Sequence, residues 1–360
     1  MKKRIALLLA VLMVCALVVG CSNASTPAAN ANASSSAKVN ESAGGTATSS
    51  SKAGSDAFAD LEPITLVLGH TNAETDPRQT MVEKFAKVVE EKTGGKLTIK
   101  IYASGELGNG KEEIEGLGMG TQDILVEGYA IMAMYSKQCM DSLPYLYRDY
   151  DHFMNCWYNS EVGDMWTKYA SDAGYTVFGA SYRGFRDVTS MKTFTKAEEV
   201  AGLKIRVPSS EPFVSTWTSL KAQATPMDLS EVITGLQQGT IQAQENPVLL
   251  SYNSGFCDVC KYLILTQHSC GADVFIMDNK HFSKLPEAYQ TVIKETAAEC
   301  SKEISISNKA LEQEYIQKFA DKGVEIIKPD MESFRKAYAG FVDKYFPQMA
   351  DIADKIAAVK

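Results

Sequence analysis

The sequence GLKIRVPSSEPFVSTWTSLKAQATPMDLSEVITGLQQGTIQAQENP, residues 202–247, alternates short strand patterns with helical patterns. Arg206 stands at the end of the first strand pattern, and Asn246 directly precedes a proline. A guanidinium on a rigid strand presents a fork of donors that matches the two oxygens of a carboxylate. The residue before a proline takes extended or turn backbone, so the Asn246 amide is free to face the same ligand. The pattern predicts an α/β unit with strands over 204–207, 224–227 and 242–245 and helices over 210–220 and 230–238.

The segment before this block shows the same alternation. Strands are expected over 64–68, 96–102 and 123–126, with helices between them, and 149–173 is expected to be one long helix. A βαβαβ beginning implies a mostly parallel sheet covered by helices, in which ligands bind beyond the carboxyl ends of the strands. His70, Asn109 and Glu127 all follow predicted strands, which makes them candidates for the rim of a pocket.

The segment after the block predicts one unusually long helix. Residues 287–322 contain no Gly or Pro in 36 positions. A continuous helix of that length would be roughly 54 Å long, more than the width of a small domain. The body of about 300 residues is expected to form two domains, because a single core rarely grows that large. We therefore expect this helix to underlie both domains.

The first residues resemble an export signal. Three basic residues precede an apolar run of fifteen residues at 5–19. Such a run is short for a bilayer span and is typical of a signal peptide, here 1–20. Small residues before Cys21 look like a bacterial lipobox, which predicts lipidation of Cys21; the alternative is an ordinary secretory signal with a chance cysteine. Residues 21–61 then form a flexible tether rich in Ala and Ser.

Composition excludes several classes of function. The net charge of −8 becomes −11 without the first twenty residues, which argues against nucleic-acid binding. None of the four histidines lies in a His-x-x-x-His pattern, and neither a Gly-x-Ser-x-Gly motif nor a glycine-rich phosphate loop is present. We therefore expect neither an enzyme nor a cofactor.

Six cysteines follow Cys21, and two of them are closely spaced. Cys257-x-x-Cys260, followed by His268 and Cys270, has a spacing similar to that of metal sites. The apolar segment 262–266 reads instead as a buried strand, so buried thiols and no metal are expected. A Cys257–Cys260 disulfide is the alternative in an exported protein.

The quoted block resembles the signature of one family, the solute-binding proteins of TRAP (tripartite ATP-independent periplasmic) transporters, which are of the DctP type and form extracellular solute-binding protein family 7. It departs from the family pattern at Gln242-Ala243, where Asp-Gly is usual. The matching segments are LKIRVP at 203–208, PM at 226–227, SEV at 230–232, LQQG at 236–239 and QENP at 244–247.

The resemblance implies a fold and a site. The fold would be the α/β two-domain type II fold of periplasmic binding proteins, with discontinuous domains and a long helix spanning both. Domain I would take 62–183 and 272–310, and domain II would take 184–271 and 311–360.

In the family, the residue at Arg206 bridges the ligand carboxylate bidentately, and the residue at Asn246 hydrogen-bonds it. Arg186 lies in a segment similar to the family's Gly-x-Arg-x-x-Thr-Ser, which supplies a second arginine to the ligand carboxylate. From the residues alone, Arg186 pairing with an acid such as Asp187 and Asn246 capping a turn remain alternatives.

Four more positions are implied as ligand contacts. Glu127 and His70 fall where other members place polar contacts from the first domain. Asn109 stands where relatives often have an acid, and Leu229 stands where many have an aromatic side chain.

The implied function is capture of a small organic acid outside the cytoplasm, in the periplasm or on the outer face of the membrane. A protein held there by its lipid anchor would deliver the ligand to TRAP membrane subunits. A ligand-sensing protein for a signalling receptor, or a binding protein of another transporter class, is the alternative.

Overall fold

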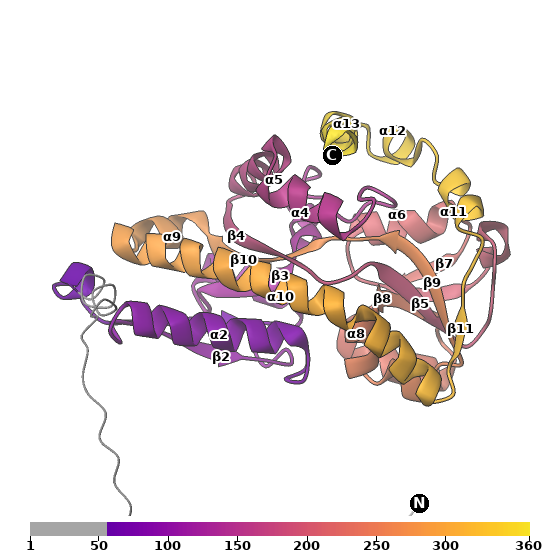
Figure 1. The fold of residues 1–360 in the computed structure, drawn as a ribbon, viewed down its shortest axis with the longest axis horizontal. Helices are drawn as coiled ribbons and strands as arrows, with labels where there is room; N and C mark the ends of the chain where they lie inside the picture. The colour runs from indigo at the N-terminus through magenta and orange to yellow at the C-terminus, as the bar shows by residue number, and fades with distance from the viewer. Residues whose placement is uncertain (1–55) are drawn as a thin grey trace, which may run out of the picture. The chain divides into compact units, whose positions relative to one another are not determined.

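The computed structural model describes residues 56–360. The expected signal peptide, Cys21 and the tether up to residue 55 lie outside the described residues. In the described part, two mixed β-sheets are flanked by helices, so the predicted α/β class is confirmed (Figure 1). Within these residues, we find no helix with the length and apolar character needed to cross a membrane.

The first sheet and the helices that pack on it form lobe I. Its strand order is β2-β1-β3-β10-β4. Strand β1 is parallel to β2 and β3, whereas β10 is antiparallel to β3 and β4. The sheet is therefore mixed, but four of its five strands run in the same direction, as the prediction of a mostly parallel sheet requires. Strand β10 is the exception, because it enters directly from the second sheet without a helical crossover. The strands are β1 (Ile64–Gly69), β2 (Leu97–Tyr102), β3 (Ile124–Gly128), β4 (Tyr175–Tyr182) and β10 (Ala272–Asp278).

Helices cover both faces of the lobe I sheet. In β10, Val274 and Ile276 pack in one core cluster, while Phe275 and Met277 pack in another. Alternate side chains of a strand point to opposite faces, so an unbroken apolar run marks a strand buried on both sides. The helical segments of this lobe are η1 (Asp56–Phe58), α2 (Pro77–Lys92), α3 (Gly110–Met119), η2 (Tyr129–Met134), α4 (Tyr150–Tyr158), α5 (Glu161–Asp172) and α9 (Asn279–Lys284).

The second sheet and its helices form lobe II. Its strand order is β11-β9-β5-β8-β6-β7. Strand β6 is parallel to β7 and β8, and β5 is antiparallel to β8 and β9. The strands are β5 (Arg186–Ser190), β6 (Lys204–Val207), β7 (Gln223–Pro226), β8 (Ala243–Pro247), β9 (Tyr262–Ser269) and β11 (Glu325–Ile327). The helical segments are η3 (Ala197–Val200), α6 (Glu211–Ser219), η4 (Leu229–Glu231), α7 (Val232–Gln238), α8 (Val248–Asn253), η5 (Phe256–Asp258) and α11 (Met331–Ala337).

Two short segments and one long helix join the lobes. The chain passes from β4 to β5 through residues 183–185 and returns from β9 to β10 through residues 270–271. Helix α10 (Glu287–Asp321) packs on β4 and α2 in lobe I and on α8 and β11 in lobe II (Figure 1). The prediction of one long helix beneath both lobes is confirmed.

The helix predicted over 149–173 is two helices. Helix α4 ends at Tyr158, and Ser160 caps the start of α5 by accepting a hydrogen bond from Val162 N. A side chain on Gly163 would meet the Trp157 carbonyl oxygen at 2.2 Å, so the turn tolerates only glycine. The apolar pattern continues across this break, which is why sequence periodicity alone does not reveal it.

The C-terminal helices reach both lobes. Helix α11 packs on η3 and β9 of lobe II, whereas α13 (Ala350–Ala358) packs on α5 of lobe I. Between them lie α12 (Phe341–Tyr345) and η6 (Pro347–Met349). The predicted domain boundaries, which place all of 311–360 in domain II, stay a prediction.

Candidate functional site

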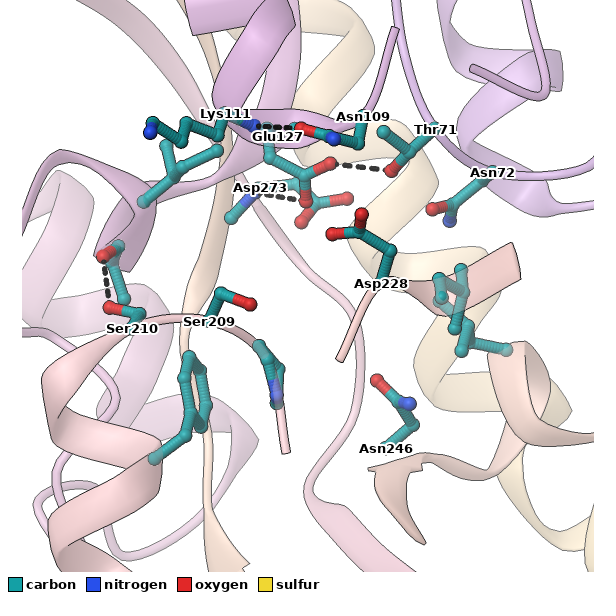
Figure 2. Close-up of a pocket in the computed structure, with 18 of the residues that line it drawn as sticks. Thr71, Asn72, Asn109, Lys111, Glu127, Ser209, Ser210, Asp228, Asn246 and Asp273 are labelled. Carbon is teal, nitrogen blue, oxygen red and sulfur yellow. Dashed lines mark hydrogen bonds between the residues drawn. The ribbon is translucent and has the colours of Figure 1, made fainter. Parts of the chain in front are cut away.

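A cavity of about 590 Å³ is lined by residues of both lobes. Its wall combines the ends of strands from both sheets with the loops beside them, which is where α/β proteins bind ligands. Figure 2 shows polar side chains from both lobes pointing into this space. Of the predicted site residues, six line it: Asn109, Glu127, Arg186, Arg206, Leu229 and Asn246.

Arg206 lies on β6, and most of its hydrogen-bond donors have no acceptor in the described residues. Its side chain is only 4% exposed, and its Nε donates to the Met227 carbonyl oxygen at 2.8 Å. Within residues 56–360 its two Nη atoms have no hydrogen-bond partner. Burial lowers the pKa of Arg206 to about 10, against the attraction of Glu245. The guanidinium therefore stays charged at neutral pH while lacking a full set of acceptors, which suits a carboxylate ligand.

Arg186 lies on β5 and is already paired. Its Nη2 donates at 2.8 Å to Glu245 Oε1 and to Asn246 Oδ1, and its Nε donates to Glu245 Oε2. The ring of Phe213 lies 4.7 Å from its guanidinium carbon. The ion-pair partner of Arg186 is Glu245 on the neighbouring strand β8, and not Asp187.

Glu245 is fully buried between Arg186 and His268. His268 Nε2 lies 3.1 Å from Glu245 Oε2. Burial opposes ionisation of Glu245, but the Arg186 charge outweighs it and holds the pKa of this carboxyl below its usual range. Burial lowers the pKa of His268, which keeps the imidazole neutral at neutral pH. The pair of arginines and this one carboxylate thus carry one net positive charge toward the cavity.

Glu127, from β3, accepts as many hydrogen bonds as a carboxylate can. Arg78 Nη1 and Nη2 donate to it at 2.9 and 3.0 Å, and Thr71 Oγ1 and Gly128 N donate at 2.8 Å. A carboxylate offers about four acceptor positions, and all are used within the protein. Burial opposes its ionisation, but Arg78 prevails and lowers the pKa of Glu127 to about 2. Glu127 lines the cavity as a charge already neutralised by Arg78.

Asp273, from β10, joins the same network. Arg78 Nε donates to its Oδ2 at 2.8 Å, and Arg183 Nε lies 3.0 Å from the same oxygen. Arg183 also lines the cavity and stands directly before Gly184 in the 183–185 crossing segment; only glycine readily adopts the Gly184 φ of 106°. Arg183 Nη2 also lies 3.9 Å from Asp76 Oδ2, so the two arginines of this network face three carboxylates.

Asn109 and Leu229 line the cavity, the first as the cap of α3 and the second as apolar surface. The Asn109 side chain accepts from Lys111 N and Glu112 N at 3.1 Å and forms the capping box of α3. Its oxygen is thereby committed to the helix, and its Nδ2 remains for a ligand. Leu229 contributes apolar surface at the start of η4.

His70 is not among the residues that line the cavity in the described chain. Its side chain is fully buried, and its Nε2 lies 2.8 Å from Gln79 Oε1 on α2. Burial lowers the pKa of His70. The expected ligand contact at His70 therefore gains no support from the geometry, because the side chain turns into lobe I and the next residue, Thr71, faces the cavity instead.

Sequence reasoning missed several lining residues: Thr71, Asn72, Arg183, Phe213 and Asp228, together with Arg78 behind the wall. One signal was present for Arg78. It follows Asp76-Pro77, the cap and first residue of α2, which is the first helix after β1. A residue at that point lies near the carboxyl end of a strand, where ligands bind.

We find no group of three or more His, Cys, Asp or Glu side chains placed to hold a metal ion in 56–360. Over the same range, the cysteines, among them Cys257 and Cys260, are buried and not disulfide-bonded.

The two mixed sheets, the short crossing segments, the long shared helix and the cavity between the lobes define a type II two-domain solute-binding protein. The chain belongs to the bacterial extracellular solute-binding protein family 7, whose sequence model matches residues 68–348. The family and its structural neighbours are binding proteins rather than enzymes.

Individual relatives agree with this assignment. The chain is 29% identical over 307 residues to the 2,3-diketo-L-gulonate-binding periplasmic protein YiaO of Escherichia coli, covering 83% of this chain and 93% of that protein. It is similar to a TRAP periplasmic solute binding protein of Roseobacter denitrificans with bound L-galactonate, with TM-score 0.78, 25% identity and coverage of 83% and 100%. A Haemophilus influenzae TRAP protein with bound L-gulonate gives TM-score 0.77, 26% identity and coverage of 82% and 99%.

Proposed function

We propose that this protein is the substrate-binding subunit of a TRAP transporter and captures a small organic acid through Arg206. The observation that carries the proposal is the pair of Arg206 Nη atoms, which have no partner in residues 56–360 although the side chain is buried at the cavity. A buried cation with open donors is costly unless an anion completes it. A carboxylate matches both the charge and the fork of donors.

Arg186 and Asn246 lie at the cavity with Arg206 and are assigned to the carboxylate end of the ligand. Arg186 is held by Glu245, and the Asn246 Nδ2 donates to Gln244 Oε1 at 2.6 Å. Both side chains are therefore fixed before a ligand arrives, which lowers the entropy lost on binding. We assign them secondary contacts to the carboxylate, with Arg206 as its main partner.

The test begins with a thermal-shift screen of organic acids, including sugar acids and C4-dicarboxylates. A ligand at 100 times its dissociation constant adds roughly 2.7 kcal/mol to stability, which is readily seen. Calorimetry on Arg206→Ala should then show a loss of roughly 2–5 kcal/mol in binding free energy. Arg206→Lys should also bind weakly, because a point charge does not reproduce the fork. Shifts with neutral sugars or peptides alone, or undiminished affinity in Arg206→Ala, would overturn the proposal.

The cellular part of the proposal rests on the first residues of the sequence. A lipid on Cys21 would hold the binding protein at the membrane, and delivery to TRAP membrane subunits would follow closure of the lobes about residues 183–185 and 270–271. Intact mass of the mature protein and detergent partitioning, with Cys21→Ala as control, test the anchor. Loss of acid uptake in cells lacking this protein, with the membrane subunits intact, separates transport from sensing.

A further inference from the structure

Residues 331–360, which we call the C-terminal strap, connect lobe II to lobe I. Helix α11 at its start packs on η3 and β9 of lobe II, and α13 near its end packs on α5 of lobe I (Figure 1). At the lobe II end, Ser333 Oγ accepts a hydrogen bond from Ala197 N at 3.1 Å. At the lobe I end, Lys355 Nζ lies 2.9 Å from Glu161 Oε1. The strap is therefore a restraint on separation of the lobes, besides the two crossing segments and helix α10.

Three side chains of lobe I hold the end of α13. Arg148, His152 and Asn155 lie just before α4 and along one face of it, since residues three or four positions apart come to the same side of a helix. Each makes a hydrogen bond with a main-chain oxygen in or after the last turn of α13. The carbonyl groups of a last turn have no partner within their own helix, so these contacts complete them. The acceptors are Ala357 O (3.1 Å) and Val359 O for Arg148, Ile356 O (2.8 Å) for His152, and Lys360 O (2.9 Å) for Asn155.

The hydrogen bonds of His152 require one neutral form of its ring. The Arg148 main-chain N–H donates to His152 Nδ1 at 3.0 Å, so Nδ1 carries a lone pair and no proton. The ring proton is therefore on Nε2, which donates to Ile356 O. The side chain is only 2% exposed, so water does not replace a lost partner. Protonation would place an N–H on Nδ1 against the Arg148 N–H, and the charged ring could not keep both contacts.

The surroundings of His152 favour this neutral form. Burial lowers the pKa of His152 below its ordinary 6.5, and the Arg148 charge adds to this, whereas the Ile356 carbonyl and Asp149 act in the opposite direction. Docking through His152 is therefore complete above about pH 6.5 and weakens as the pH falls below it. The titratable and charged side chains on the elements packed around the ring are Arg148, Asp149 and Tyr147 beside α4, Lys355 on α13, and Glu161 on α5.

We infer that the C-terminal strap is a pH-sensitive connection between the lobes, docked on lobe I while His152 is neutral and released when the ring takes up a proton. Release of α13 removes one restraint on lobe separation and leaves the crossing segments 183–185 and 270–271 in place. The lobes therefore separate more easily in acid surroundings. This property goes beyond the capture of an acid by Arg206, and it does not depend on which ligand binds.

Hydrogen exchange of the unliganded protein, corrected for the intrinsic effect of pH on exchange, measures the docking of α13. We expect the protection of residues 350–358 to fall about tenfold between about pH 7.5 and about pH 5, since docking loses at most about tenfold for each pH unit below the ordinary pKa of histidine. Protection of α10 and α11 should fall much less, because neither helix is held by His152.

His152→Gln tests the role of the histidine, because its amide can donate to Ile356 O and is uncharged at both pH values. In this variant the protection of α13 should not depend on pH over the same range. His281→Gln removes a histidine from α9 and is the matched control, so it should keep the loss seen in the parent. Arg148→Gln should lower the protection of α13 at both pH values, since it removes two donors to the end of the helix.

Small-angle X-ray scattering measures whether release of the strap lets the lobes separate. The unliganded parent should expand at about pH 5, and His152→Gln should not. The inference is overturned if α13 is equally protected at both pH values, or if α10 and α11 lose protection together with it. It is also overturned if His152→Gln loses as much protection as the parent, or if the loss brings no expansion. None of these measurements uses a ligand, so their failure is distinct from failure of acid binding through Arg206.

Discussion

Arg186 and Glu245 form a buried ion pair, in which Nη2 of the arginine donates to Oε1 of the carboxylate at 2.8 Å. Because Glu245 balances Arg186, the neighbouring Arg206 is left as the buried cation with open donors. Arg186 lies on β5 and Arg206 on β6, the two strands that flank β8, which carries Glu245. This one carboxylate makes Arg186 a supporting group and leaves Arg206 as the proposed ligand receptor.

The buried charge of Arg206 should lower the free energy of unfolding of the protein when no ligand is bound. Burial lowers the pKa of Arg206 to about 10, so charge at this position disfavours the folded state. Arg206→Met should raise the free energy of unfolding by roughly 1–3 kcal/mol at pH 7, since one unit of pKa corresponds to about 1.4 kcal/mol. Urea unfolding of the unliganded protein measures this. Arg335→Met, at an exposed position, is the control and should stay within about 0.5 kcal/mol; a less stable Arg206→Met would contradict the prediction.

Removing the Glu245 carboxylate should lower the free energy of unfolding. Glu245→Gln leaves the buried guanidinium of Arg186 beside Arg206 with no balancing carboxylate. Loss of one partner of a buried ion pair typically costs about 3–5 kcal/mol. Chemical unfolding at pH 7 checks this, with the exposed Glu295→Gln as the matched control. Equal stability of the two variants would show that the pair contributes little.

The Arg78–Glu127 pair should make the protein sensitive to acid. Arg78 outweighs burial and lowers the pKa of Glu127 to about 2, from an ordinary 4.5. A depressed pKa adds stability above about pH 4.5, and this stability is lost as the pH falls toward 2. In Glu127→Gln, unfolding free energy should therefore depend less on pH across this window. Arg78→Met should lose about 3–5 kcal/mol at pH 7, because it strands Glu127 in the wall of the cavity.

Asp187 should make the protein less stable as the pH rises, the opposite of the effect of Glu127. Burial raises its pKa to about 8, against the hydrogen bond from Gln267 N, and Glu312 adds to the rise. The folded state then holds a proton that the unfolded chain releases near pH 4. Stability contributed by this group falls between about pH 4 and 8, by about 1.4 kcal/mol per pH unit. Asp187→Asn retains the acceptor for Gln267 N, so its unfolding free energy should decline less over this range; parallel pH profiles would refute the prediction.

Local patterns in the sequence predicted much of the frame. The block at 202–247 predicted its strands and helices, because their periodicity and turn residues act over a few positions. The 36 residues without Gly or Pro predicted α10. The break between α4 and α5 was missed, since the apolar pattern runs through it. The structure shows the turn at Gly163, where a Cβ would meet the Trp157 carbonyl oxygen at 2.2 Å.

The site was predicted in part. Arg206, Arg186 and Asn246 line one cavity, as expected from strand ends and from the family resemblance. His70 does not, because its side chain is buried in lobe I, where its Nε2 lies 2.8 Å from Gln79 Oε1, and Thr71 lines the cavity instead. The partners of Arg78 could not be predicted, since Asp273 lies 195 residues away and reaches it only through the pairing of β10 with β3.

The sequence by itself determined most of the strands and helices, the family and the arginines available for an acid, because these depend on local propensity and on residue type. The tertiary structure decided which charges remain open. Glu245 neutralises Arg186 and Arg78 neutralises Glu127, whereas the Nη atoms of Arg206 have no hydrogen-bond partner in the described chain. Charge balance in a buried site depends on distances between strands far apart in sequence, and those distances exist only once the two sheets have formed.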